Sequence, residues 1–197
     1  MPSVLPRHKR LSFILSAAAL ALLASVAGSA MPSSAAAQTA SFGSGVHRVG
    51  KDITAGTYRT RGSRTDCYWE RLRGFSGDFD DIIANDFSSG FQVVTIKGTD
   101  KGFRSSRCGR WSSNLSRVTA SMTSFGQGTF IVGTDMRPGT YRSSRGADCY
   151  WERLRGFTGD FGQIIANDFR ESGRAIVTIK STDKGFSSSR CGTWTKI

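Results

Sequence analysis

After about residue 40, hydrophobic and polar residues alternate over short segments. These segments are rich in β-branched and aromatic residues, with Gly, Asn and Asp between them: VHRV (46–49), TYRT (57–60), CYWERL (67–72), DIIA (81–84) and QVVTIK (92–97). The i, i+3, i+4 apolar spacing of an amphipathic helix is missing from this part of the sequence. The pattern predicts an all-β chain whose many short strands form small β-sandwiches or partial barrels.

The alternation also predicts which side chains are buried. In VVTIK, Val94 and Ile96 point to one face, while Val93, Thr95 and Lys97 point to the other. We therefore expect Val94 and Ile96 in the core. Further core candidates are Val177, Ile179, Ile82, Ile83, Phe75, Phe103 and Trp111. The residues ANDF (84–87) are typical of a turn, in which the Asp86 side chain would cap its own backbone.

The sequence contains an internal duplication. DCYWERLRGF occurs at 66–75 and again at 148–157, and the similarity extends from Phe42–Trp111 to Phe125–Trp194. This predicts two tandem modules, 41–111 and 125–197, joined by a Ser- and Thr-rich linker at 112–124.

The N-terminal residues 1–37 have the composition of a cleaved signal peptide. Arg7, Lys9 and Arg10 precede an apolar stretch at 11–27, and small residues follow, with cleavage candidates after Ala30 and Ala37. No later segment is long and apolar enough to span a bilayer. We therefore expect a secreted protein without a membrane span in the mature chain.

The four cysteines are expected to form two disulfides, because export implies an oxidising compartment. A module that once stood alone could pair its two cysteines only with each other, which predicts Cys67–Cys108 and Cys149–Cys191. Each bond closes a loop of about 40 residues, worth about 4 kcal/mol in the chain-entropy description. A zinc site is the alternative, but C-x-x-C spacing is missing and the compartment is unsuitable.

Several motifs together resemble a known repeat. VGKDITAGTYR (49–59) and VGTDMRPGTYR (132–142), each followed by CYWERL, IIAND and CG-x-W, are similar to a module of secreted proteins and lipoproteins of actinobacteria. The resemblance covers nearly all of the mature chain and implies an exported, β-rich, disulfide-containing module without an established activity. Copy one departs from the pattern at Ala55, where copy two has Pro138.

The residues favour a protein without catalytic function. His47 is the single histidine after the signal peptide, and copy two has Phe130 at that position, so a repeated Ser-His-Asp or Cys-His site is hard to assemble. The repeated acids are Glu70, Glu152, Asp86 and Asp168. We interpret them as structural, with Glu70 paired to the neighbouring Arg71 and Arg73. A calcium site at Asp78, Asp80 and Asp81 is not repeated, so we expect no metal and no cofactor.

The charge predicts the class of partner. The chain carries a formal charge of +12, and subtracting the three bases of the signal peptide leaves +9, of which each copy carries +4 and Arg117 in the linker the last. Such a charge attracts anionic wall polymers, anionic lipid surfaces or, without sequence specificity, nucleic acid. The predicted binding residues are Tyr68, Arg71 and Arg73, with their copies Tyr150, Arg153 and Arg155. Trp69 is expected to pack on its disulfide as core.

These features together predict a secreted, non-catalytic binding protein of the cell envelope that engages an anionic polymer or a partner protein. One alternative is an inhibitor of a protease or lysozyme that presents Arg61–Thr65 or Ser105–Arg107. The other is an envelope hydrolase that uses Glu70 and Glu152. The oligomeric state, and whether the two modules touch, stay open at this level.

Overall fold

A computed structural model describes residues 40–62 and 64–197 of the chain. Copy 1 contains eight strands: β1 (Ser41–Phe42), β2 (Gly45–Arg48), β3 (Gly56–Thr60), β4 (Arg64–Leu72), β5 (Ile82–Gly90), β6 (Val93–Ile96), β7 (Gly102–Ser106) and β8 (Trp111–Ser112). Copy 2 repeats them: β9 (Ser124–Phe125), β10 (Gly128–Ile131), β11 (Gly139–Ser143), β12 (Cys149–Leu154), β13 (Ile164–Arg170), β14 (Ile176–Ile179), β15 (Gly185–Ser189) and β16 (Trp194–Lys196). A short 3-10 turn precedes β5 and β13, at Phe79–Asp81 and Phe161–Gln163.

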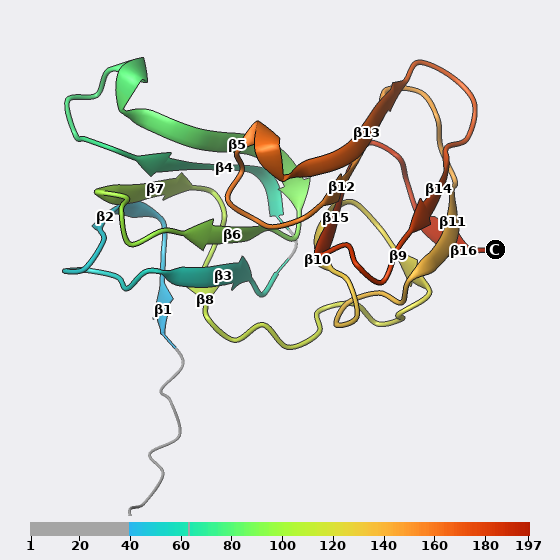
Figure 1. Cartoon of the computed structure of the whole chain (residues 1–197), viewed down its shortest axis with the longest axis horizontal. Coiled ribbons are helices and arrows are strands. Elements are labelled where there is room, and N and C mark those ends of the chain that lie inside the picture. The colour runs from blue at the N-terminus through green and yellow to red at the C-terminus, as the bar shows by residue number, and fades with distance from the viewer. Residues whose placement is uncertain (1–39, 63) are drawn as a thin grey trace, which may run out of the picture. The chain divides into compact units, whose positions relative to one another are not determined.

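Each copy consists of two antiparallel sheets with open edges (Figure 1). In copy 1 the strand orders are β1-β8-β3-β6 and β2-β7-β4-β5. The equivalent strands of copy 2 follow the same orders, β9-β16-β11-β14 and β10-β15-β12-β13. The predicted all-β fold of two modules with one disulfide each is therefore confirmed, and neither module is a closed barrel.

The core of each copy lies between its two sheets and is mainly aromatic. Trp111 and Phe103 in copy 1, and Trp194 and Phe186 in copy 2, pack edge to face with ring centroids 5.3 and 5.2 Å apart. Both tryptophans are fully buried and donate their indole N–H to a serine hydroxyl, so the buried polar group is satisfied. The predicted core residues Val94, Ile96, Val177, Ile179, Phe103 and Trp111 are all buried, as is Trp69.

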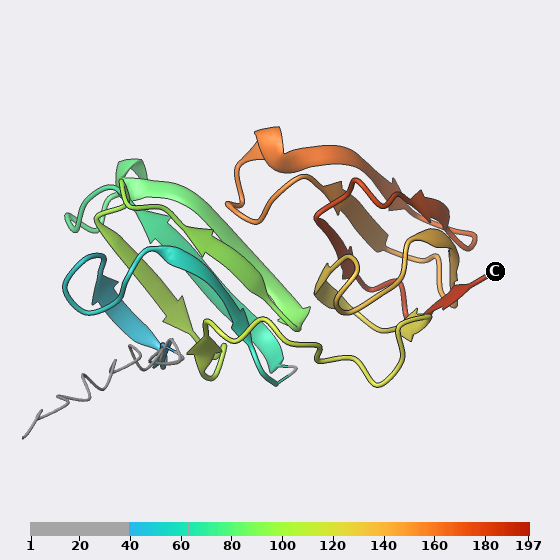
Figure 2. The same ribbon diagram turned by 60° about the horizontal axis from the view of Figure 1, so that its bottom comes forward.

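Three expectations about the elements were wrong or incomplete. Phe75 is 50 % exposed rather than core, because it belongs to the loop after β4. Ile82 and Ile83 are only half-buried. ANDF is not a turn: it lies inside β5, where Asn85 pairs with Glu70 across the sheet. Because β5 is an edge strand with one solvated face, polar side chains are tolerated within it (Figure 1 and Figure 2).

The two copies contact each other, and all described residues belong to one compact unit. The backbone N–H of Thr129 donates to the Phe91 carbonyl at 2.6 Å, beside a parallel bridge between Phe91 and Gly128. Gly90 permits this approach, because a Cβ atom there would lie 2.1 Å from the carbonyl oxygen of Gln127. The predicted signal peptide, residues 1–37, lies outside the described residues.

Candidate functional site

The two disulfides form as predicted. Cys67 bonds Cys108 and Cys149 bonds Cys191, and all four cysteines are buried beside the aromatic core. Each bond joins the strand that contains CYWERL, β4 or β12, to the loop that follows its neighbour in the sheet, β7 or β15. It thereby fixes one end of that sheet, which we call the disulfide end of the copy.

The backbone at the disulfide ends has an unusual conformation. Among the described residues, those other than glycine with positive φ are Asp66, Arg107, Asp148 and Arg190, at 54° to 59°. Each of the four directly precedes a cysteine. Asp adopts this left-handed conformation comparatively easily, whereas for a long side chain such as Arg it costs about 1–2 kcal/mol.

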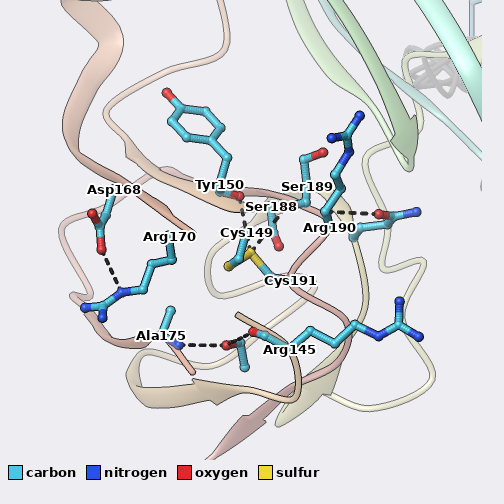
Figure 3. The surroundings of a disulfide bond; sticks show 12 residues. Arg145, Cys149, Tyr150, Asp168, Arg170, Ala175, Ser188, Ser189, Arg190 and Cys191 are labelled. Carbon is cyan, nitrogen blue, oxygen red and sulfur yellow. Dashed lines mark hydrogen bonds and ion pairs between the residues drawn. A yellow bond between two sulfur atoms is a disulfide. The ribbon is translucent and has the colours of Figure 1, made fainter. Parts of the chain in front are cut away.

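Arginines surround the disulfide of copy 2 (Figure 3). Arg190 precedes Cys191, Arg170 is opposite Cys149 in the β12–β13 ladder, and the Arg145 backbone N–H donates to the Cys191 carbonyl at 3.0 Å. All three side chains are exposed, and those of Arg145 and Arg190 extend away from the disulfide. Arg170 pairs with Asp168 at 2.9 Å.

Copy 1 has a similar group of arginines at its disulfide end. Arg64 begins the strand that contains Cys67, and its guanidinium lies close to Gly109. Arg107 and Arg110 flank the Cys108–Gly109 dipeptide, and all three arginines are exposed. We define the disulfide-end arginines as Arg64, Arg107, Arg110, Arg145, Arg170 and Arg190. The acids in the same regions are Asp66 and Asp86 in copy 1 and Asp148, Asp168 and Glu171 in copy 2.

The predicted binding arginines occupy two different environments. Arg71 is fully buried and forms a two-point ion pair with Asp100, at 2.7 and 2.8 Å. Arg153 pairs with Asp183 in the same way, at 2.7 and 2.9 Å. Arg71, which was predicted to bind a partner, is therefore not exposed, because it neutralises a buried aspartate.

Arg73 and Arg155 are exposed, but they follow the last residue of β4 and β12. They therefore lie at the end of each sheet that is opposite the disulfide. The larger group of arginines at the disulfide ends was not predicted from the sequence. The repeated Arg-Cys-Gly tripeptide at 107–109 and 190–192 was the available signal.

The predicted tyrosines form a repeated contact with the glutamates. The Tyr68 hydroxyl donates to Glu70 at 2.5 Å, and the Tyr150 hydroxyl donates to Glu152 at the same distance. Burial and the hydrogen bond to Glu152 raise the pKa of Tyr150 to about 12. Both tyrosines therefore stay protonated and act as donors to a carboxylate.

The two glutamates differ in their other neighbours. Glu70 is almost fully buried and pairs with Arg104, not with Arg71 or Arg73 as expected. Copy 2 has Ser187 where copy 1 has Arg104, so Glu152 lacks the equivalent cation. Burial raises the pKa of Glu152, and the Asp86 carboxylate raises it further. The hydrogen bond from Tyr150 acts in the opposite direction and lowers it. The Glu70 carboxylate is thus enclosed by its own neighbours rather than open to a substrate.

The hollows of the surface are small. One of about 250 Å³ is lined by Phe91, Phe125, Phe130 and the linker residues Val118–Ala120. A second, of about 190 Å³, lies beside Tyr58. Pockets for small molecules usually measure about 300–1,000 Å³, so these hollows give little support to a small-molecule site. Residues 40–62 and 64–197 contain no group of three or more His, Cys, Asp or Glu placed to hold a metal ion.

No helix in the described part of the chain is long and apolar enough to cross a membrane. Comparison with curated proteins and with solved structures gives no match. The sequence profile of the Rv1352-like extracellular domain does match, once over residues 39–112 and again over 122–195. The chain therefore belongs to the family of Rv1352-like extracellular domains and contains two tandem copies of that domain.

Proposed function

We propose that the protein is a secreted, non-catalytic binding protein of the cell envelope that engages an anionic polymer through its disulfide-end arginines. The observation that carries the proposal is the conformation of Arg107 and Arg190. Both are exposed, both have φ of 59°, and both directly precede a disulfide cysteine.

A left-handed conformation is unfavourable for arginine, and glycine would adopt it at no steric cost. Neither side chain is buried in the core, so packing does not compensate for the unfavourable backbone. A side chain that is retained at a conformational cost, and that faces solvent in both copies, suggests contact with an external partner. The guanidinium group suits phosphate or carboxylate because it forms two parallel hydrogen bonds.

Aromatic residues on the same sheets extend the proposed surface. Phe87 lies opposite Tyr68 across the β4–β5 ladder, and Phe169 lies opposite Tyr150 in copy 2. The two phenylalanines are 62 % and 56 % exposed. An arginine cluster beside exposed aromatic rings suits a polymer with charged groups and sugar rings or bases. We also assign Arg73 and Arg155 to the polymer surface, whereas Arg71 and Arg153 support it from within the sheet.

The test measures retention of the mature protein on isolated cell wall, on teichoic polymer and on DNA at increasing salt. We expect binding at low salt that weakens as salt rises, because bound arginines release counterions. Replacing Arg107 and Arg190 by Asn removes two charges and keeps a residue that tolerates positive φ. The slope of log affinity against log salt should fall by about two.

The matched control replaces Lys101 and Lys184 by Gln, which removes the same charge beside β7 and β15, at the end away from the disulfides. A third variant, with Arg73 and Arg155 changed to Gln, measures the contribution of that end. Absence of binding to all three polymers at low salt would contradict the proposal. So would equal losses in the Arg107/Arg190 variant and the lysine control.

The second candidate function is inhibition of an extracellular hydrolase. It is favoured by the position of residues 61–62, 64–65 and 106–107, which are exposed at the disulfide end of copy 1, where a covalent bond holds the chain. A constrained exposed segment loses little entropy on binding to an enzyme. Residual activity of proteases and lysozymes, titrated with the protein, tests this candidate. Unchanged activity at a large excess of the protein would reject it for the enzymes tested.

A further inference from the structure

The two copies contact each other through unlike surfaces. Arg59 of copy 1 donates to both carboxylate oxygens of Asp135 in copy 2, at 3.1 and 2.9 Å, and both side chains are fully buried. Arg142 of copy 2 corresponds to Arg59 of copy 1, and Asp52 of copy 1 corresponds to Asp135 of copy 2. Arg142 and Asp52 are exposed, and neither forms an ion pair with another described residue. The contact is therefore heterologous rather than symmetric.

A second group of contacts is equally one-sided. The edge strand β6 of copy 1 is covered by a loop of copy 2, with the Thr95 N–H donating to the Phe157 carbonyl at 2.7 Å. Lys97 pairs with Asp160 of that loop at 3.1 Å. With the roles of the copies exchanged, β14 is the edge strand that contains Thr178, and Lys180 directly follows it. The corresponding loop of copy 1 contains Phe75 and Asp78.

Burial shows which surface of each copy is not covered by the other copy. Val93 on β6 is 3 % exposed, whereas its counterpart Ile176 on β14 is 57 % exposed. Thr158 in the covering loop of copy 2 is buried, whereas its counterpart Ser76 is exposed. We call Arg142, Ile176, Thr178 and Lys180 the free basic edge. We call Asp52, Phe75, Ser76 and Asp78 the free acidic loop.

Both free surfaces keep the side-chain chemistry of the internal contact. Arg, Thr and Lys recur on the edge, and Phe and two Asp residues recur on the loop side. The glycines of the close backbone approach recur as Gly45 and Gly173, where the space is open. Beside these glycines, Arg174 replaces Phe91 and Val46 replaces Thr129. The loss of the Phe91 ring should make a contact between chains weaker than the internal one.

Charge differences between the copies act in both directions. The loop of copy 1 has Asp80 and Asp81 where copy 2 has Gly162 and Gln163, and Arg174 adds a positive charge to the edge side of copy 2. Near Asp52, however, copy 1 has Arg48 and Lys51 where copy 2 has Ile131 and Thr134. The charge complementarity of the free surfaces is therefore greatest between the loop acids and the basic residues near β14, which favours their encounter.

We propose that the free basic edge of one chain binds the free acidic loop of a second copy, so that the chains associate head to tail. The contact repeats the internal one: Arg142 meets Asp52, Lys180 meets Asp78, and β14 donates its Thr178 N–H to the Phe75 carbonyl. An exposed edge strand with an apolar residue such as Ile176 is a ready site for such pairing. A heterologous contact that does not close on itself continues from chain to chain.

Sedimentation of the mature chain without polymer tests this association. We expect the average mass to rise with protein concentration and to fall with salt. Lys180→Glu should weaken association roughly tenfold by placing two acids together, and Asp78→Lys should weaken it similarly. The double variant, which restores opposite charges between chains, should recover association. Arg117→Glu is the control, because it reverses an exposed charge in the linker.

Three results would overturn the proposal. The first is a monomer at every concentration and salt. The second is an association that Lys180→Glu and Asp78→Lys leave unchanged. The third is a loss in the single variants that the double variant does not recover, because Lys180 and Asp78 would then not meet each other.

Discussion

At the scale of single residues, the duplication allows the same side chain to be compared in two environments. Glu70 and Glu152 occupy equivalent positions and accept the same tyrosine hydrogen bond. Only Glu70 has an arginine partner, because Arg104 is replaced by Ser187 in copy 2. The same substitution of the two residues should therefore have different effects.

We predict that Glu152→Gln is at least as stable as the wild type at pH 7. Burial raises the pKa of Glu152 above its ordinary value of 4.5, so the folded state favours the protonated carboxyl. This stabilisation is fully present below pH 4.5 and is lost as pH rises through the folded pKa. Urea unfolding from pH 4 to 8 should show the advantage of the variant growing with pH.

Glu70→Gln is the matched comparison. It leaves the half-exposed Arg104 without its partner, and we expect a loss of about 0.2–1 kcal/mol at pH 7. Equal effects of the two substitutions would show that Arg104 does not distinguish the sites. Any activity toward envelope polymers that disappears in both variants would favour the hydrolase alternative.

At the scale of elements, each module depends on two short-stranded sheets and one disulfide. The bonds link cysteines 41 and 42 positions apart, so their entropic contributions should be similar. The residue before each of these cysteines has positive φ. The disulfide thus connects the stability of the module to the presentation of Arg107 and Arg190.

We predict that replacing Cys67 and Cys108 by Ala lowers the free energy of unfolding by about 4 kcal/mol. The equivalent change of Cys149 and Cys191 should cost a similar amount. Calorimetry of both variants checks this. Unchanged stability of either variant would mean that packing alone holds that module. Polymer binding by that variant would then show whether the disulfide is needed to position Arg107 or Arg190.

At the scale of the whole molecule, the copies are joined by a buried ion pair that the duplication did not reproduce elsewhere. Arg59 and Asp135 are fully buried, and Asp135 also accepts the backbone N–H groups of Val118 and Ile131. Two joined modules present two sets of disulfide-end arginines on one chain. In the proposed function, binding of one set to a polymer would raise the effective concentration of the other set for the same polymer.

We predict that Arg59→Ala costs about 3–5 kcal/mol, because it leaves the buried Asp135 carboxylate without its cation. Arg142→Ala, the equivalent change at an exposed position, should stay within about 0.5 kcal/mol of wild type. In calorimetry the first variant should broaden or split the unfolding transition as the copies separate. Equal effects of the two substitutions would contradict a structural role for the pair.

Much of the architecture could be predicted from the residues alone. Alternation in VVTIK assigned Val94 and Ile96 to the core, and duplication gave the disulfide pairing, because both depend on local spacing and on the repeat. The polar stretch at 84–87 could not be assigned, since an edge strand with a solvated face resembles a turn in composition. Similarly, Arg71 and Arg73 look alike in sequence although one is buried.

The sequence by itself determined the strand content, the two modules and their disulfides, since these follow from residue order and redox compartment. Only the tertiary structure decided which of two identical side chains is buried. Arg59 and Arg142 stand in the same motif, yet one neutralises an aspartate of the other copy and the second faces solvent. The reason is physical. A heterologous contact joins one surface of the first module to a different surface of the second, so each module keeps one of its two contact surfaces free.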